Sequence, residues 1–127
     1  MMLSQRIEAQ FIASAARTVT FNSEDFCDLN NSSGLFFLNI TAASGTTPTL
    51  DIKIQNKCQA TGIYYAITGA SFAQKTAAGT DFIAIDPALT SSANKAISQI
   101  LGPCFRAVCT IGGTTPSFTF SLTYVPA

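Results

Sequence analysis

Apolar side chains recur at every second position through much of this chain of 127 residues. In residues 49–55, TLDIKIQ, the apolar Leu50, Ile52 and Ile54 alternate with polar residues. Such a period of two indicates a β-strand with one buried face, because successive side chains of a strand point to opposite faces. The strand candidates are TVTF (18–21), LFFLNITA (35–42), TLDIKIQ (49–55), IYYAIT (63–68), ASFAQ (70–74), DFIAID (81–86), CFRAVCTI (104–111) and SFTFSLTYV (117–125). Eight short strands predict an all-β sandwich or barrel, and we favour a single antiparallel β-sandwich.

One segment departs from this period. In SSANKAISQILGP (91–103), Ile97, Ile100 and Leu101 follow a candidate capping residue, Ser92, with the spacing i, i+3, i+4. Gly102 and Pro103 then supply a stop signal. The segment therefore predicts one short helical turn near residues 92–101, crossing one end of the sandwich.

The run Gly-Thr-Thr-Pro occurs twice, at residues 45–48 and 113–116, each time between two strand candidates. Glycine supplies an unusual φ angle, and proline is tolerated at the first residue of a strand because its missing N–H is not needed there. Each run therefore predicts a hairpin, and the two together predict equivalent hairpins in two packed sheets. Duplication and convergence would both explain the recurrence, and the remaining strands do not repeat.

The chain carries little charge and no net charge. Charged residues make up 11% of the sequence, against roughly 25% in typical soluble domains. Seven basic and seven acidic residues cancel, which removes the long-range field on which binders of nucleic acid and anionic membranes depend. No run approaches the roughly 18 apolar residues of a membrane span, and Arg6 and Glu8 interrupt any signal-peptide core. We expect no nucleic-acid or membrane partner, and instead a subunit packed against neighbours.

Four cysteines are present, Cys27, Cys58, Cys104 and Cys109. None has the paired spacing of a zinc ribbon, so no metal site is predicted. The offset of five between Cys104 and Cys109 places them on opposite faces of one strand, where they cannot bridge. We expect four free thiols in a reducing compartment, and the sequence leaves open whether any of them oxidise later.

The chain has no histidine, which excludes Ser-His-Asp and Cys-His catalysis. We expect neither an enzyme nor a cofactor. The acidic cluster SEDFCD (23–28) lacks the alternating oxygen ligands of a calcium loop and indicates a solvated loop. Tyr64-Tyr65, with Phe36-Phe37 and Phe72, would offer an aromatic platform for a sugar or a nucleic-acid base. Adjacent strand residues alternate, however, so one of each pair is expected in the core.

The N-terminal segment has an apolar spacing of its own. Leu3, Ile7, Phe11 and Ile12 are separated by four, four and one residues, which fits an amphipathic helical face or an extended arm. We expect residues 1–16 to form an arm on an adjacent subunit and residues 17–127 to form the domain. The alternative is that this segment is the first strand of its own sandwich. The candidate interface residues are Leu3, Arg6, Ile7, Phe11, Ile12 and Arg17.

Three longer stretches carry a resemblance to a known group. They are NITAASGTTPTLDIKIQ (39–55), IYYAITGASFAQKTAAGTDFIAI (63–85) and ILGPCFRAVCTIGGTTPSFTFSLTYV (100–125). The chain resembles small β-sandwich structural proteins of tailed-bacteriophage virions and is most similar to head decoration, or cement, proteins. The shared features are Phe105 and Arg106 after Leu-Gly-Pro, then Gly-Thr-x-Pro and a final aromatic strand. Cys104 departs from the pattern, which would have a larger aromatic residue there.

The resemblance implies a jelly-roll-like subunit that forms a homotrimer. It would bridge neighbouring copies of the major capsid protein on the virion surface, after assembly in the host cytoplasm. Two alternatives remain open at this stage. One is a tail or neck structural protein. The other is a receptor- or glycan-binding module of a tail fibre, which would need an exposed aromatic cluster beside Tyr64 or Tyr65.

Overall fold

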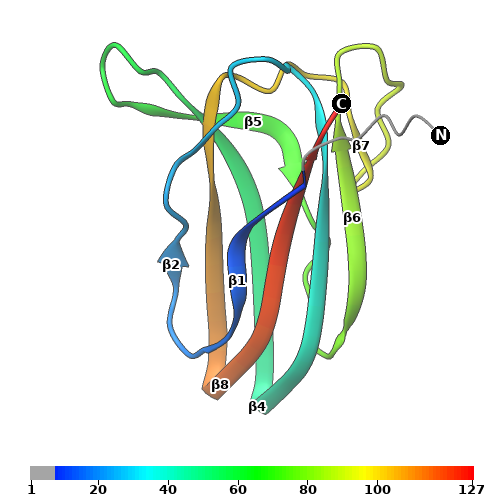
Figure 1. Ribbon diagram of the computed structural model, residues 1–127. Helices are drawn as coiled ribbons and strands as arrows, with labels where there is room; N and C mark the ends of the chain where they lie inside the picture. The colour runs from blue at the N-terminus through cyan, green and yellow to red at the C-terminus, as the bar shows by residue number, and fades with distance from the viewer. Residues whose placement is uncertain (1–7) are drawn as a thin grey trace, which may run out of the picture.

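The computed structural model describes residues 8–127, and within them it contains strands and no helix (Figure 1). The all-β prediction is confirmed. The strands are β1 (Ala9–Arg17), β2 (Phe21–Asn22), β3 (Phe26–Cys27), β4 (Gly34–Lys57), β5 (Tyr64–Ser71), β6 (Gly79–Ile85), β7 (Ala96–Ile97) and β8 (Cys104–Pro126).

These strands form one mixed sheet. Its main path runs β1-β8-β4-β6-β7, with β2 and β3 also paired to β8 and β5 to β4. The long strands β4 and β8 pair antiparallel along nearly their whole lengths. The expectation of a purely antiparallel arrangement is wrong at one edge, where β7 lies parallel to β6.

The hairpin prediction for the two Gly-Thr-Thr-Pro runs is wrong. Each run lies inside a continuous strand, residues 45–48 in β4 and 113–116 in β8, and the runs lie opposite each other with Thr46 facing Thr114. Both strands bend sharply together at this point, at the bottom of Figure 1. A pair of strands bending together turns the whole sheet, whereas a hairpin would turn only one of them.

The bend divides the sheet into two halves. The first half contains residues 34–44 of β4 and 117–126 of β8, flanked by β1 and β6. The second half contains residues 49–57 of β4 and 104–112 of β8, flanked by β2, β3 and β5.

The hydrophobic core lies between these halves. Phe36 of the first half packs edge-on against Phe105 of the second, with ring centroids 5.5 Å apart, and both rings contact Tyr124. All three side chains are essentially fully buried. Such aromatic clusters add specific edge-to-face contacts to the burial of large apolar areas, so this cluster fixes one half of the sheet against the other.

The helical turn expected near residues 92–101 is absent, and this prediction is wrong. Ser92 and Ala96 instead form a tight β-bridge that leads into β7. Ile97 is buried, but Ile100 is 60% exposed, so the predicted apolar face does not form. The backbone of this segment instead forms hydrogen bonds with the edge of β6. A short isolated helix at this position would be only marginally stable.

A disulfide corrects the expectation of four free thiols. Cys27 in β3 lies directly opposite Cys104 in β8, and their sulfur atoms are 2.06 Å apart. Cys58 and Cys109 are free. The two bonded residues are 77 positions apart, and Cys27 lies in a segment where no strand was expected, so local spacing could not reveal the pair.

The segment Ala9–Arg17 is the first strand of this chain's own sheet, in agreement with the alternative for the N-terminus. It pairs with β8, placing Ile12 opposite Leu122. Ile12 is 3% exposed, and Phe11 packs on the core rings of Phe36 and Phe105.

Candidate interaction faces

The structure places the candidate interface residues of the N-terminal segment in different environments. Phe11 and Ile12 point into the core, so they are not available to anchor another subunit. Arg17 ends β1, where one of its terminal nitrogens donates to the Ala13 carbonyl, 2.9 Å away, and its guanidinium lies over the Phe21 ring. Leu3, Arg6 and Ile7 lie outside the described residues.

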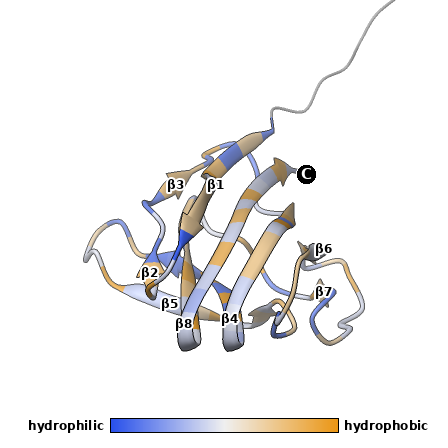
Figure 2. Cartoon of the chain, turned by 90° about the horizontal axis from the view of Figure 1, so that it is seen from below, coloured by the Kyte–Doolittle hydropathy of each residue, from blue (hydrophilic) through white to orange (hydrophobic). Residues whose placement is uncertain are grey.

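The outer surface of the first half carries a different candidate. Residues 34–44 of β4 and 117–126 of β8 contain no Asp, Glu, Lys or Arg, and Figure 2 shows them in pale or orange colours. Alternation along the strands directs the neighbours of the buried core residues outward. We call this surface the uncharged face. Its residues are Leu35, Phe37, Asn39, Thr80, Phe82, Ala84, Thr119 and Thr123.

Two phenylalanines stand out on the uncharged face. Phe37 and Phe82 lie directly opposite each other on β4 and β6, with ring centroids 6.3 Å apart. They are 42% and 45% exposed and line an open groove of about 490 Å³, together with Asn39 and Thr80. Adjacent exposed aromatic rings on a surface with few charges are typical of a protein–protein contact.

One edge of this groove is held by ion pairs. Asp81 accepts a hydrogen bond from Lys75, 2.6 Å away, and another from Lys95. Burial raises the pKa of Asp81, but the two lysine hydrogen bonds outweigh it and leave the pKa below its ordinary value. Lys95 also lies over the Phe82 ring, 4.9 Å from its centroid, so the aromatic pair is bounded on this side by a cation.

The outer surface of the second half carries the opposite chemistry. Alternation directs Asp51, Lys53 and Lys57 of β4 outward, and Arg106 of β8 beside them. We call these four residues the charged face. The seven basic residues are scattered along the sequence, but the pairing of β4 with β8 brings three of them together here.

An ordered cluster lies at one end of the charged face. Asp25 accepts hydrogen bonds from Lys57 and from the Tyr64 hydroxyl, each 2.5 Å long. These bonds hold the pKa of Asp25 below its ordinary value. The Arg106 guanidinium lies 3.5 Å from the Tyr64 ring centroid and donates through Nε to Gln55 Oε1, 3.0 Å away. Arg106 therefore covers the Tyr64 ring on the outer face, while Tyr65 is broadly exposed. The expectation that one of the Tyr64-Tyr65 pair lies in the core is wrong, because Tyr64 packs on Arg106 rather than on the core residues.

The acidic segment 23–28 does not converge on a metal ion. Asp28 accepts hydrogen bonds from Tyr124, Asn30 and Asn31, away from the Lys57 contact of Asp25. Burial raises the pKa of Asp28, but these hydrogen bonds lower it overall. Within residues 8–127, no group of three or more ligating side chains could hold a metal.

Sequence reasoning missed the Phe37–Phe82 pair and the Arg106–Tyr64 stack. Alternation places Phe37 outward, but its partner depends on the β4–β6 register, which the sequence does not encode locally. The absence of charge from residues 34–44 and 117–126 was visible, and it is the one signal that could have located the uncharged face.

Comparisons with protein-family models, with curated proteins and with solved structures find no match to this chain. In the part of the chain that the structure describes, no helix is long and apolar enough to cross a membrane.

Proposed function

We propose that this chain is a structural virion protein of a tailed bacteriophage, a decoration or cement subunit that stabilises the head. It would bridge neighbouring copies of the major capsid protein on the capsid surface, after assembly in the host cytoplasm. The uncharged face is the contact surface, and Phe37 and Phe82 are its aromatic anchors.

The observation that carries this proposal is the exposed Phe37–Phe82 pair on a sheet surface whose β4 and β8 residues carry no charge. Desolvating such a face on binding removes apolar area from water, and the ionised groups at its edge, Lys95 and Asp81, are paired with each other. Aromatic residues at the centre of a contact typically supply much of its binding free energy. Many copies on a shell would add weak contacts into strong clamping.

The finer architecture belongs to the same proposal. A sheet folded at a shared bend, with its core between the halves, is compatible with a jelly-roll-like β-sandwich. Because residues 35–125 resemble cement proteins, we include in the proposal that the subunit forms a homotrimer.

The test compares the full chain with a Phe37→Ser/Phe82→Ser variant. Light scattering of the wild-type protein is expected to give three times the mass of the 13.4 kDa chain. Co-sedimentation with purified phage capsid shells is expected for the wild type and lost for the double variant. Tyr65→Ser is the matched control, because it also removes an exposed aromatic ring, but from β5 rather than from the uncharged face.

Two results would contradict the proposal. The first is a wild-type protein that is monomeric at all concentrations and does not sediment with shells. The second is binding to shells that the double variant retains. Circular dichroism of the double variant is expected to match the wild type, because both side chains lie outside the core.

A glycan-binding module of a tail fibre is the second candidate function. It is favoured by the groove itself, where the Phe37 and Phe82 rings lie beside the polar side chains of Asn39 and Thr80. Sugars stack on aromatic rings while their hydroxyls bond to such groups. Saturable binding on a glycan array, abolished in the Phe37→Ser/Phe82→Ser variant, would favour this function over cementing.

A further inference from the structure

The guanidinium of Arg106 is held rigidly, yet part of it is unused. Its Nε donates to Gln55, and its plane rests on Tyr64. Tyr64 is fixed in turn by Asp25, which Lys57 holds. Within residues 8–127, the two terminal nitrogens of Arg106 have no hydrogen-bond or ion-pair partner. A fork of donors is therefore held in one orientation without an acceptor.

A second cation without a partner lies beside this fork. Lys53 pairs with Val108 across the β4–β8 ladder, so it is the diagonal neighbour of Arg106 on the same face. Diagonal neighbours are about 7–8 Å apart, which long side chains can span. Lys53 is exposed and, in the described part of the chain, its ammonium has no acceptor.

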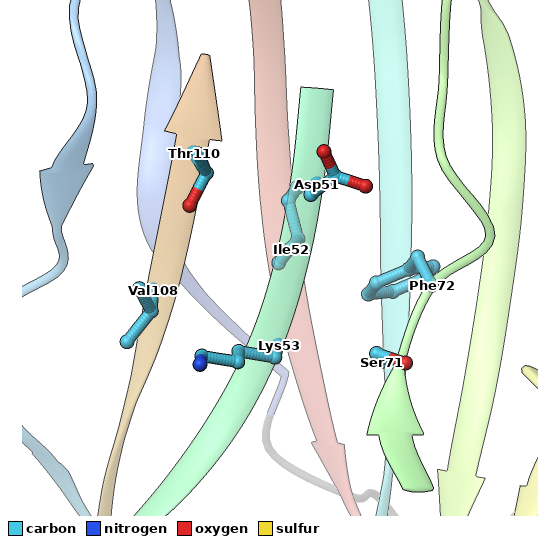
Figure 3. A pocket seen from close by; sticks show the side chains of 7 residues that line it. All are labelled: Asp51, Ile52, Lys53, Ser71, Phe72, Val108 and Thr110. Atoms are coloured by element: carbon cyan, nitrogen blue, oxygen red, sulfur yellow. The ribbon is translucent and has the colours of Figure 1, made fainter. Parts of the chain in front are cut away.

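The acidic neighbour of Lys53 does not neutralise it. Figure 3 shows the Lys53 amine directed toward β8, beneath Val108, while the Asp51 carboxylate points to the other side of β4. There Asp51 accepts a hydrogen bond from Gln74, 2.9 Å away. An open groove of about 280 Å³ runs past Lys53, Val108 and Thr110.

We propose that Lys53 and Arg106 form a binding site for a carboxylate, supplied by an Asp or Glu side chain of a protein partner. The two terminal nitrogens of Arg106 donate to the two oxygens of the carboxylate, and the Lys53 ammonium donates to a second lone pair on one of those oxygens. The aliphatic stem of the partner's side chain rests on Val108. This site lies on the second half of the sheet and does not depend on the uncharged face, so it fails or holds independently of the cement function.

The chemistry favours a protein carboxylate over a phosphate. A planar donor fork matches the two oxygens of a carboxylate, and a guanidinium already stacked and bonded loses little freedom on binding. Phosphate sites usually add a glycine-rich loop or a helix N-terminus, and the charged face is a flat strand surface. The carboxylate of a protein partner is presented on a large protein surface, whose other contacts add to the binding. Such a ligand therefore does not need an enclosing pocket.

The test is a ¹H–¹⁵N NMR titration of the full chain with an octaglutamate peptide. The amides of Lys53, Val108 and Thr110 and the Nε–H of Arg106 are expected to shift together and saturate. The shifts are expected to weaken as ionic strength rises from about 0.01 M to about 0.1 M, because the contact is charged and exposed. Octaglutamine is the matched peptide and is expected to cause no saturable shift.

Three variants locate the site. Arg106→Gln and Lys53→Gln are each expected to lower the affinity by about tenfold, the usual size of one charge-assisted hydrogen bond. Lys95→Gln removes the same charge from the first half and is expected to leave the affinity within about twofold. If Arg106→Gln does not fold, the Lys53→Gln variant alone decides the question, because Lys53 is exposed and its ammonium makes no ion pair with the described residues.

Three outcomes would overturn the site: shifts that do not saturate, equal loss in Lys95→Gln, and inorganic phosphate binding Lys53 and Arg106 as tightly as the peptide. The last outcome would make this a small-anion site rather than a protein contact. Octaglutamate is expected to bind the Phe37→Ser/Phe82→Ser variant as well as the wild type, and a loss of binding in that variant would be a fourth result that contradicts the site.

Discussion

Thr46 and Thr114 lie opposite each other at the point where β4 and β8 bend, and each follows the glycine of a Gly-Thr-Thr-Pro run. The two runs have the same backbone: φ is 113° at Gly45 and 111° at Gly113, and 46° at both Thr47 and Thr115. Each run therefore packs on the other through an approximate twofold axis. The bend is a joint property of two distant segments.

Both glycines should be intolerant of a side chain. A Cβ on Gly45 would lie 2.7 Å from the Thr115 carbonyl oxygen, and one on Gly113 would lie 2.7 Å from that of Thr47. Because the obstructing atoms are backbone, we expect Gly45→Ala and Gly113→Ala each to lower the free energy of unfolding by about 2–4 kcal/mol. The two values should agree within about 1 kcal/mol, which urea unfolding followed by circular dichroism would measure.

Gly62→Ala is the control for that pair. Gly62 also has a positive φ, 75°, but no atom of residues 8–127 lies within 4 Å of the point that a Cβ would occupy there, so only the backbone term of about 1–2 kcal/mol applies. A Gly45→Ala variant no less stable than Gly62→Ala would show that the bend relaxes readily.

The same twofold relationship links the two outer faces. Residues near the bend correspond at an offset of 68, which becomes 69 beyond the β4 irregularity between Ile40 and Ala42. Phe36 then corresponds to Phe105, and these two rings meet in the core. Phe37 corresponds to Arg106. Equivalent outward positions thus carry a phenylalanine on the uncharged face and an arginine on the charged face, so the two halves share a framework and differ in the partner they suit.

The sequence predicted which face of a strand a side chain occupies better than it predicted which strands pair with each other. Alternation correctly separated buried Phe36 from exposed Phe37, because strand periodicity is local. It could not show that Thr46 faces Thr114, since the same Gly-Thr-Thr-Pro chemistry suits a hairpin and a shared bend. Non-local pairing also decided the Cys27–Cys104 disulfide and the β6–β7 edge, where backbone bonds replaced the expected helical turn.

The disulfide should contribute measurably to stability. Closing a loop of 77 residues restricts the unfolded chain, so Cys27→Ala/Cys104→Ala is expected to lower the free energy of unfolding by about 2–4 kcal/mol. Thiol titration of the wild type should find two thiols after unfolding and four after added reductant. Cys58→Ala is the control, and we expect it to change stability by less than about 0.5 kcal/mol. Four thiols without reductant would contradict the disulfide.

The two free cysteines should differ in reactivity. A hydrogen bond from the Thr61 hydroxyl lowers the pKa of Cys58, whereas burial raises the pKa of Cys109 to about 12. Since the thiolate is the nucleophile, iodoacetamide at neutral pH should alkylate Cys58 first, and Thr61→Val should slow that reaction several-fold, roughly twofold to fivefold. Peptide mass spectrometry over time measures both rates. In urea the two cysteines should react alike, and equal rates in the folded protein would contradict the prediction.

Acid should weaken the ion pairs of Asp81. Its folded pKa lies below its ordinary value of 3.8, so the carboxylate stabilises the fold above about pH 4, and this contribution is lost as the pH falls through the folded pKa. We expect Asp81→Asn to lower the free energy of unfolding by about 1–3 kcal/mol at pH 7, because Lys75 and Lys95 lose their charged acceptor. The difference in the free energy of unfolding between Asp81→Asn and the wild type should shrink in strong acid, where both chains carry an uncharged group at this position.

Asp25 and Asp28 also have lowered pKa values, but both proteins contain them, so their acid response cancels in the difference. Glu24→Gln, at an exposed position, is the control and should match the wild type at both pH values. An Asp81→Asn deficit that stays constant between neutral and strongly acidic pH would show that the ion pairs do not supply the stability assigned to them.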